Sequence, residues 1–319
     1  MDGLMALYKP AGFTSHDVVA RVRRLTRERS VGHTGTLDPE ATGVLVLCLG
    51  RATRLSRFLM DMPKAYEAEI VFGSATTTGD SHGQVVARMD GFTIPREAVV
   101  DALHKFTGEI MQVPPMVSAV HYEGRRLYEL AREGITVERE ARRVTVYGIV
   151  PVDLDAWPEP IVSGSSVRIA VECSKGTYIR TLCEDICASL GVPGHMGSLV
   201  RTRASGFSLE ECATIEAVAA AAETADYGAV LHPMARGVAH LPRLMMNDLE
   251  TVRALNGNVI RADAGRVTGA GASGRGWTAL FDPDGSLAAV AWAEPGGAAC
   301  DDGVALHPKV VLGREAEGS

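Results

Sequence analysis

The sequence has 319 residues, of which 46% are hydrophobic and 22% charged, so composition excludes a globally disordered chain. This length predicts one large domain with a small one, or two domains. No apolar stretch approaches the roughly 20 uninterrupted residues that a membrane span needs. The N-terminal residues also lack the basic flank and long apolar run of a secretory signal. We therefore expect a cytoplasmic protein that does not insert into membranes.

Cysteine usage points to a reduced protein without a metal site. The six cysteines form no C-x-x-C pair, which argues against a disulfide framework and against a zinc site. Cys183 and Cys187 lie four residues apart on an expected helix, but two thiols alone do not make a metal site. We expect neither a metal nor another cofactor.

The charge distribution is more informative than its sum. The net charge is −7 and the isoelectric point is about 5.7, which argues against a nucleic-acid partner. Residues 1–60, however, carry nine basic and five acidic side chains. Because salt screens charges beyond roughly 8–10 Å, a phosphate backbone responds to such a local excess. Nucleic-acid binding and a plain solvated helix face both fit this pattern.

The first half of the chain alternates helical and strand patterns. Residues 15–29 have the spacing of an amphipathic helix, with Ser15 as its expected N-cap. A loop rich in glycine and threonine follows and leads into an apolar run, residues 44–49, that is typical of a buried strand. The remaining elements expected up to residue 190 are strands over 66–73 and 167–173 and helices over 95–107 and 178–190.

Two later regions differ from the first half in composition. Residues 114–147 carry a cluster of alternating charges, which indicates an exposed helix and loop that project from the body. From about residue 240, glycine becomes frequent and short apolar runs alternate with turns such as Asp284-Gly285. This pattern predicts a small all-β module built from hairpins.

Three polar features could carry chemistry. Asp38 stands between Leu37 and Pro39, where it could be a nucleophile, a general base, or a turn residue before proline. In KGTYIRTL, the strand-like spacing places Tyr178 and Arg180 on one side, and an inward-facing Arg180 could be the counterion of Asp38. Tyr66 opens a strand and could stack on a base.

Motifs of several common enzyme classes are missing from the sequence, namely the P-loop, the dinucleotide fingerprint, H-E-x-x-H and G-x-S-x-G. Five long segments occur instead, in this order: GLMALYKPAGFTSHDVV, GHTGTLDPEATGVL, KAYEAEIVFGSATTTGDSHG, VPPMVSAVHYEGRRLYELAREG and CSKGTYIRTLCEDI. With these segments, residues 2 to about 310 resemble the bacterial tRNA pseudouridine synthase B family. That family converts uridine-55 in the T-loop of tRNA to pseudouridine.

The resemblance implies a fold and a domain organisation. We expect an α+β pseudouridine synthase core with a mixed, mainly antiparallel sheet, followed by a small C-terminal β-barrel of the PUA type. The expected boundaries are a catalytic domain over 1–238 with an RNA-clasping arm at about 115–145, a PUA-like RNA-binding domain over 239–312, and a frayed tail over 313–319.

The resemblance also assigns site residues. It makes Asp38 the essential catalytic residue, which could bond to the sugar C1′ or to C6 of uracil, or support a glycal intermediate by removing a proton. Arg180 would keep this carboxylate ionised in a dry pocket. Tyr66 would pack on the target base and take part in removing the C5 proton.

Other residues would bind or support the substrate site. Tyr178 and Leu199 would line the uracil pocket, and Asp80 would hold Arg180 in place. His33 would fill the gap left by the everted nucleotide. Lys9, in the K-P-A-G segment, would brace the site.

RNA contacts outside the pocket are expected from the arm, whose residues 123–143 contain six arginines and five glutamates. With so nearly balanced a charge, shape and ordering on binding should matter more than electrostatic attraction. One departure from the family pattern is Val200, which stands where we expect a basic residue, so one phosphate contact is missing or shifted. The expected partner is the T-stem-loop of tRNA, bound by a monomer without an obligatory protein partner.

Three alternatives remain open. A non-catalytic protein that binds or folds tRNA would use the same binding segments but would not need Asp38. A guide-RNA-dependent pseudouridine synthase would need protein partners, whereas the arm at 121–143 favours action without them. A nucleoside glycosidase with an aspartate nucleophile would release free uracil.

Overall fold

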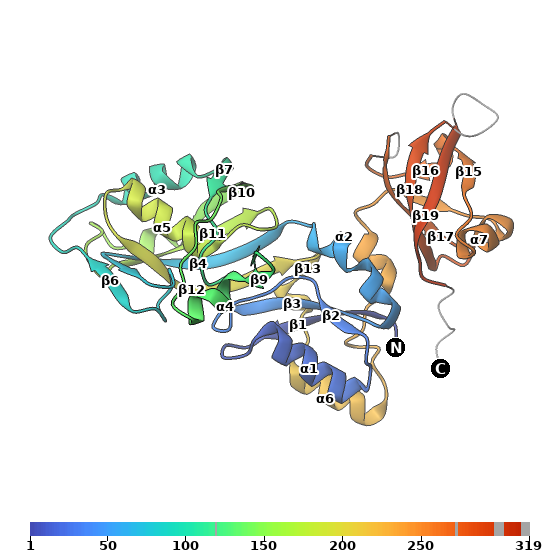
Figure 1. The fold of residues 1–319 in the computed structure, drawn as a ribbon, viewed down its shortest axis with the longest axis horizontal. Helices are drawn as coiled ribbons and strands as arrows, with labels where there is room; N and C mark the ends of the chain where they lie inside the picture. The colour runs from blue at the N-terminus through green and yellow to red at the C-terminus, as the bar shows by residue number, and fades with distance from the viewer. Residues whose placement is uncertain (119, 272–273, 297–302, 314–319) are drawn as a thin grey trace.

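The large sheet forms the centre of the protein. The computed structural model describes residues 1–118, 120–271, 274–296 and 303–313 (Figure 1). Within them, nine strands form one sheet. Seven follow the order β1-β3-β12-β4-β11-β10-β7, and the two short strands β2 and β13 pair with β3 and β12, respectively. Its pairs are antiparallel except for β3 with β12, which confirms the mixed, mainly antiparallel sheet. The strands are β1 (Gly3–Lys9), β2 (Val31–His33), β3 (Thr42–Leu49), β4 (Lys64–Phe72), β7 (Gly108–Gln112), β10 (Arg142–Val152), β11 (Ser166–Cys173), β12 (Gly194–Ala204) and β13 (Phe207–Ser208).

Helices cover the sheet at both ends. Helices α1 (Ser15–Thr26) and α6 (Ile215–Thr224) pack on one face of β1 and β3, and the 3-10 helix η1 (Gly50–Leu55) and α2 (Ser56–Met60) pack on the other. Successive side chains of a strand point to opposite faces, so a strand buried on both sides is apolar throughout. The apolar run over 44–49 in β3 is such a strand. Helices α3 (Arg96–Lys105) and α5 (Ile179–Ser189) cover the β4–β11–β10 end (Figure 1).

The start of α1 differs from the sequence prediction by one residue. Thr14, not Ser15, is the N-cap, because the Thr14 hydroxyl accepts from the backbone N–H of Asp17 and the Asp17 carboxylate accepts from that of Thr14. Ser15 is the first helical residue. Its hydroxyl accepts a 2.9 Å hydrogen bond from the backbone N–H of Leu37, which ties the helix to the loop before β3.

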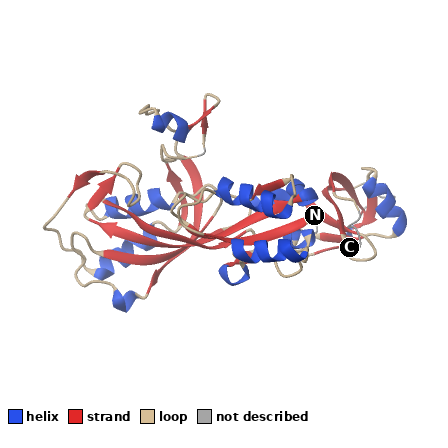
Figure 2. Cartoon of the chain, turned by 90° about the horizontal axis from the view of Figure 1, so that it is seen from below, coloured by secondary structure: helices blue, strands red, loops and turns tan. Residues whose placement is uncertain are grey.

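The charged segment projects from the body as an arm, as its composition predicts. After β7, the chain forms a hairpin of β8 (His121–Tyr122) and β9 (Arg125–Arg126), then α4 (Leu127–Arg132), and returns to the sheet at β10. Figure 2 shows this hairpin and helix standing away from the large sheet. Directly after β4, β5 (Ser74–Thr76) and β6 (Val85–Arg88) form a separate hairpin, and Asp80 in its loop forms a bridge with Met196 of β12.

The C-terminal part is a curled six-stranded sheet in the order β15-β19-β18-β17-β14-β16, with α7 (Asp248–Leu255) packed against it. This half-barrel confirms the small PUA-like β-module. Gly285 forms the turn of the β17–β18 hairpin with φ +83°, the left-handed conformation that favours glycine. Residues 314–319 of the expected frayed tail lie outside the described residues. The strands are β14 (Arg243–Met245), β15 (Ile260–Asp263), β16 (Val267–Thr268), β17 (Gly276–Phe281), β18 (Leu287–Pro295) and β19 (Gly303–Val311).

The C-terminal sheet packs on the η1–α2 segment. The rings of Phe58 and Trp277 lie 5.2 Å apart edge to face, and the Arg57 guanidinium lies 4.2 Å from the centre of the Trp277 ring. Arg51 also donates a 2.6 Å hydrogen bond to the backbone carbonyl of Leu312. No helix in the described part of the chain has the length and apolar character needed to cross a membrane.

Candidate active site

The loop before β3 is held from beneath by buried polar groups. The carbonyl of Asp38 accepts from the N–H of Ala41, which closes a turn around Pro39. Lys9, fully buried at the end of β1, donates to the carbonyls of Pro10, Phe13 and Pro39 over 2.7–2.9 Å. Burial lowers the pKa of Lys9 to about 8. Lys9 thus braces the loop through backbone contacts and does not itself line the cavity described below.

Asp38 and Arg180, which are 142 residues apart in the sequence, form an ion pair. Nε of Arg180 lies 3.0 Å from Oδ2 of Asp38, and its second terminal nitrogen donates to Oδ1 over 3.4 Å. Two backbone carbonyls complete the set of acceptors around this guanidinium, those of Thr78 at 2.9 Å and Val117 at 2.8 Å. A planar guanidinium held on three sides presents a fixed positive charge to the carboxylate.

The backbone around Arg180 corrects the strand-like interpretation of KGTYIRTL. Tyr178 is the N-cap of α5 and Arg180 lies in the first turn of that helix, so the two residues do not alternate along a strand. The side-chain amide of Gln112 accepts from the N–H of Tyr178 at 3.0 Å and donates to its carbonyl at 3.3 Å, which holds the residue that precedes the helix. This contact with β7 is long-range, and local propensity carries no sign of it.

Two further expectations need adjustment. The Asp38 side chain is 39% exposed, whereas that of Arg180 is 4% exposed, so the carboxylate is in contact with water rather than in the expected dry pocket. Asp80 does not hold Arg180 directly. Its carboxylate accepts from the Thr78 hydroxyl at 2.6 Å and from the N–H of His82 at 3.0 Å, and it is the Thr78 carbonyl that Arg180 contacts.

The wall beside Asp38 comes from two paired strands. Tyr66 of β4 lies opposite Arg201 of β12, and Leu199 lies opposite Ala68. Alternation places Lys64 and Tyr66 on the same face of β4. Burial raises the pKa of the Tyr66 hydroxyl, which is therefore neutral near pH 7.

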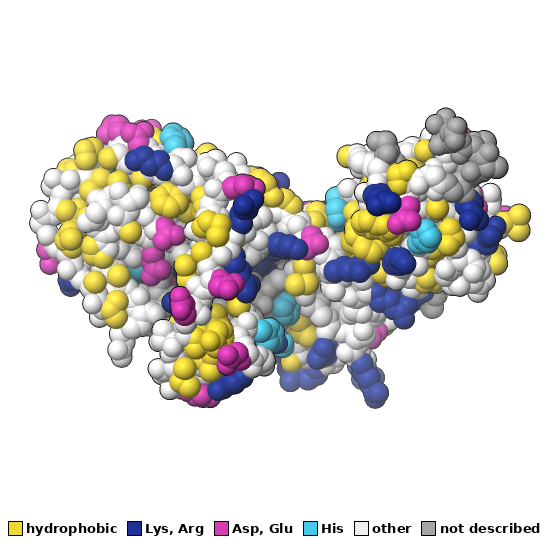
Figure 3. Space-filling view, turned by 45° about the horizontal axis from the view of Figure 1, so that its top comes forward, with side chains coloured by type: hydrophobic (Ala, Val, Ile, Leu, Met, Phe, Trp, Pro, Cys, Tyr) yellow, Lys and Arg dark blue, Asp and Glu magenta, His cyan; other side chains and the backbone are white. Residues whose placement is uncertain are grey.

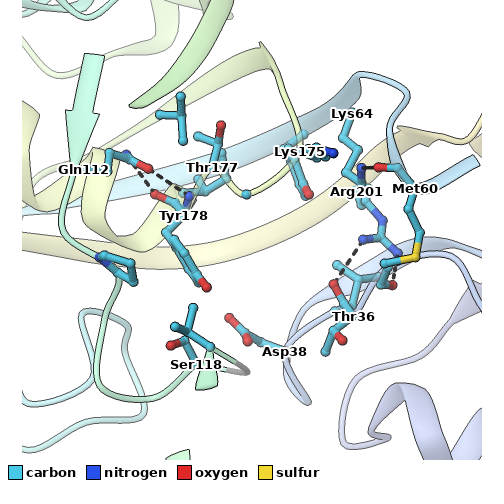
Figure 4. Close-up of a pocket in the computed structure, with 18 of the residues that line it drawn as sticks. Thr36, Asp38, Met60, Lys64, Gln112, Ser118, Lys175, Thr177, Tyr178 and Arg201 are labelled. Carbon is cyan, nitrogen blue, oxygen red and sulfur yellow. Dashed lines mark hydrogen bonds between the residues drawn. The ribbon is translucent and has the colours of Figure 1, made fainter. Parts of the chain in front are cut away.

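Arg201 is a site residue that sequence reasoning missed. It is 2% exposed and donates to the carbonyls of Val44, Gly35 and Thr36 at 2.7, 3.1 and 3.2 Å. Arg201 thus holds the backbone before Asp38, whereas Lys9 holds the carbonyl of Pro39 directly after it. Figure 4 shows its guanidinium reaching the backbone at Thr36. Strand alternation places Arg201 on the same face as Leu199, so the period of the strand could have indicated this residue.

These residues enclose a cavity of about 690 Å³. Figure 4 shows the ring of Tyr178 pointing toward Asp38 across it. Asp38, Tyr66, Tyr178, Arg180 and Leu199 all line this cavity, so the structure brings these candidate residues together. His33 does not line it and precedes the first lining residue, Thr34.

His33 lies beside the cavity with its ring 5.3 Å from that of His16, edge to face. Burial lowers the pKa of His33 to about 4, and the nearby His16 and Arg201 add to this effect. The imidazole is therefore neutral near pH 7, and its Nδ1 accepts from the N–H of Gly35 at 3.3 Å.

The cavity is basic although the chain is acidic. Asp38 and Asp61 are its two acidic lining residues, against seven basic ones. Figure 3 shows Lys and Arg side chains gathered around the hollow in the middle of the molecule. A site with this local charge attracts an anionic polymer at distances shorter than the screening length. The basic residues are Arg57, Lys64, Arg142, Arg143, Lys175, Arg180 and Arg201.

Within the described ranges, histidine, cysteine and carboxylate side chains form no group of three that could hold a metal ion. Cys183 and Cys187 are both buried on α5, and burial raises the pKa of Cys187 to about 12. The side chains that line the cavity of about 690 Å³ include a carboxylate, a guanidinium and two phenols, those of Asp38, Arg180, Tyr66 and Tyr178.

Comparison with known proteins begins with the fold. The structure matches the crystal structure of a Cbf5-Nop10-Gar1 complex with a TM-score of 0.73 and 27% identity, over 97% of this chain and 84% of the other. The fold is that of the pseudouridine synthases.

Sequence comparison then gives the family. Residues 23–179 match the family model "TruB family pseudouridylate synthase (N terminal domain)", and residues 180–239 match "tRNA pseudouridylate synthase B C-terminal domain". The tRNA pseudouridine synthase B of Geobacillus kaustophilus is 46% identical over 83% of this chain and 92% of its own length. That of Symbiobacterium thermophilum is 48% identical over 81% and 82%. The chain belongs to the TruB family of pseudouridine synthases, which are isomerases.

Proposed function

We propose that this protein isomerises uridine-55 in the T-loop of tRNA to pseudouridine, with Asp38 as the catalytic residue. The relatives named tRNA pseudouridine synthase B support tRNA as the substrate. The observation that carries the proposal is the Asp38–Arg180 ion pair, because it presents a partly exposed carboxylate to a basic cavity with room for a nucleotide. A protein that only bound RNA would gain nothing from a carboxylate there, since it repels phosphates.

The reaction is balanced without any other reactant. The bond between N1 of uracil and C1′ of ribose breaks, the base turns, and a bond between C5 and C1′ forms. C5 loses its proton and N1 gains one, so product and substrate are isomers. Asp38 can bond to C1′, bond to C6, or remove a proton to give a glycal, and each route needs an ionised carboxylate against the nucleotide.

The lining residues supply the rest of the site. The target uridine must leave the stacked loop to reach Asp38. Tyr66 packs against the everted uracil, and Tyr178 and Leu199 complete the pocket walls. The neutral ring of His33 stacks in the gap left by the base. Once RNA covers the open side of the cavity, water leaves and the ion pair strengthens.

The protein acts alone, as a monomer, without a metal, an organic cofactor or a protein partner. The second candidate function is that of an enzyme that works only with protein partners. The likeness to a chain from a Cbf5-Nop10-Gar1 complex suggests this candidate. A T-arm hairpin incubated with the purified chain separates the two. Pseudouridine formed at position 55 by the chain alone supports our proposal, and turnover only after addition of other proteins overturns it.

Asp38→Asn tests the role of the carboxylate. The isosteric amide removes the negative charge, so we expect product formation to stop while tRNA binding stays within about threefold. Loss of binding with retained chemistry would refute the assignment. Chromatography of the wild-type reaction also tests the glycosidase alternative, because a hydrolase releases free uracil and an isomerase does not.

A further inference from the structure

One hydroxyl group at the cavity of Asp38 has no role within the protein. Ser118, at the base of the arm, lines this cavity and is 7% exposed. Its Oγ is buried and has no hydrogen-bond partner among the residues that the structure describes. Buried side-chain hydroxyl groups are nearly always hydrogen-bonded, so an exception at the wall of a binding cavity indicates a contact with a ligand.

Two threonines that line the same cavity use their hydroxyl groups inside the protein. Thr34 shares a 2.8 Å hydrogen bond with the hydroxyl of Ser205. The hydroxyl of Thr177 donates to the carbonyl of Ser174 at 3.0 Å. These two groups stabilise the fold around the cavity, whereas the hydroxyl of Ser118 remains available to a substrate.

Ser118 is held directly beside the ion pair. The carbonyl of Val117, the preceding residue, accepts a 2.8 Å hydrogen bond from a terminal nitrogen of Arg180. The same nitrogen donates to Oδ1 of Asp38 over 3.4 Å. Figure 4 shows Ser118 next to Asp38. The free hydroxyl is therefore close to the part of the nucleotide on which Asp38 acts.

The backbone of Ser118 is also tied to the arm. Its N–H donates to the carbonyl of Met116 at 3.0 Å, and its carbonyl accepts from the N–H of Tyr128, in α4, at 3.1 Å. Both backbone polar groups of Ser118 are thus used, and Arg180 holds the residue before it. A side chain fixed from two sides can position a substrate group with little loss of conformational entropy.

We propose that the hydroxyl of Ser118 forms a hydrogen bond with the 2′-hydroxyl of the target uridine and so holds its C1′ atom against Asp38. The inference rests on the proposed function and adds a ribose contact to it. A serine hydroxyl and a ribose 2′-hydroxyl can each donate and accept, so the pair is complementary in either direction. The 2′-hydroxyl is carried by C2′, which is bonded to C1′, so a group beside Asp38 can reach it.

The reaction itself favours the ribose over the uracil as the partner of Ser118. The uracil turns between the breaking of its N1 bond and the formation of its C5 bond. A hydrogen bond from a fixed side chain to one edge of the uracil is therefore lost during the reaction. The ribose stays linked to the RNA through its phosphates, so a hydroxyl fixed by Arg180 and the arm can keep the same ribose contact from substrate to product.

The test combines a change in the substrate with a change in the protein. T-arm hairpins with uridine or 2′-deoxyuridine at the target position are assayed with wild-type protein, Ser118→Ala and the control Ser165→Ala. Ser165 is 9% exposed, but its hydroxyl accepts a 3.0 Å hydrogen bond from the N–H of Val162, and it does not line the cavity. Single-turnover assays give the rate constant of the chemical step, and filter retention gives the dissociation constant.

The compared quantity is the ratio of the rate constant on uridine to that on 2′-deoxyuridine, because the change in intrinsic sugar reactivity is common to the three proteins. We expect this ratio to be at least about fivefold larger for the wild type and Ser165→Ala than for Ser118→Ala. If the 2′-deoxyuridine hairpin reacts with none of them, the corresponding ratio of dissociation constants decides. Equal ratios in the three proteins would overturn the inference, and they are also the result expected for a contact with uracil.

Stability separates a substrate contact from a structural role. Because the hydroxyl of Ser118 is buried without a partner among the described residues, Ser118→Ala should melt at the wild-type temperature or above it. Ser165→Ala leaves the N–H of Val162 without its acceptor and should melt at a lower temperature. A clear decrease for Ser118→Ala would show that the protein uses this hydroxyl for folding and would contradict the ribose contact.

Failure of the ribose contact is distinguishable from failure of the proposed function. No turnover of the uridine hairpin by the wild-type protein contradicts the proposed function. Normal turnover of that hairpin, with equal ratios in the three proteins, contradicts only the contact between Ser118 and the ribose.

Discussion

The ammonium group of Lys9 donates a 2.8 Å hydrogen bond to the backbone carbonyl of Pro39, the residue that directly follows Asp38. Its two other N–H groups go to Pro10 and Phe13, so all three donors are used. A fully buried lysine with three backbone acceptors fixes the position of the loop relative to the end of β1. The position of the Asp38 carboxylate thus depends on a side chain that does not line the cavity.

Substitution of Lys9 by Met should therefore reduce catalysis more than binding. Methionine keeps the length but removes all three hydrogen bonds, and a displacement of about 1 Å at Asp38 lowers kcat by roughly 100-fold. Single-turnover assays on a T-arm hairpin measure the rate constant of the chemical step, and filter binding measures the dissociation constant. A variant that loses binding and catalysis in equal proportion would show that Lys9 contacts RNA.

The same residue gives a pH signature in stability. The folded-state pKa of about 8 lies below the unfolded value of 10.5, so between these values the unfolded chain binds more protons than the folded one. The stability of the wild type relative to Lys9→Met should accordingly rise as pH increases through this window. Urea unfolding at the two ends of the window measures the difference. A constant difference would contradict the burial of a charged Lys9.

Arg201 should matter for folding as well as for the site. Arg201→Met leaves three carbonyls without donors, those of Val44, Gly35 and Thr36. Each unsatisfied buried group costs about 1–3 kcal/mol, so we expect the free energy of unfolding to fall by about 3 kcal/mol or more. Arg203→Met is the matched control on the same strand. Its guanidinium is 48% exposed and pairs with Glu172, and such surface pairs contribute about 0–1 kcal/mol.

Sequence patterns predict the elements that have a clear period or a continuous apolar run. The run over 44–49 is β3, the alternation from residue 66 is β4, and the charged segment is the arm. The resemblance to a family directed attention to Asp38 and Arg180, and their ion pair confirms the counterion expected from the chemistry of a buried arginine. These features are local, or need only the complementarity of two charges.

Long-range contacts explain what the sequence could not predict. A helix over 178–190 is predicted, but the sequence gives no sign that the Gln112 side chain of β7 bonds both the N–H and the carbonyl of Tyr178, the residue before its first turn. That Arg201 lies opposite Tyr66 depends on the register between β12 and β4. Asp80 contacts Arg180 only through Thr78, whose hydroxyl donates to Asp80 and whose carbonyl accepts from Arg180. The spacing of these residues in the sequence does not show this arrangement. The roles of His33, Tyr178 and Leu199 remain predictions.

Two substitutions separate the contribution of the Tyr66 ring from that of its hydroxyl group. Burial raises the pKa of this phenol, so its hydroxyl is neutral near pH 7. If Tyr66 helps to move the C5 proton, it does so by relaying a proton through this neutral hydroxyl. Tyr66→Phe should keep tRNA binding and lower kcat by roughly 100- to 10,000-fold, the usual contribution of a positioned acid or base. Tyr66→Leu should weaken both. Full activity of the Phe variant would restrict Tyr66 to packing.

His33 should make the protein less stable in mild acid. Its pKa of about 4 in the folded chain lies below the unfolded value of 6.5, so between these values the unfolded chain binds more protons. Stability therefore falls as pH decreases through this window, and His33→Gln should remove much of that fall. Urea unfolding at both ends of the window tests this expectation. His16→Gln, which changes the exposed ring beside His33, is the control and should retain most of the pH dependence.

The arm should gain order when RNA binds. Its hairpin has two residues in each strand, and α4 has six residues, of which Leu127 and Leu130 are buried. Two-stranded hairpins and single helical turns are marginally stable, so backbone amides here should open often in the free protein. Binding of a T-arm hairpin should slow hydrogen exchange over 121–134 by roughly tenfold or more, while β4 amides stay unchanged. Equal protection of the arm in the free and bound states would show a preformed clasp, in which case recognition would depend on shape alone.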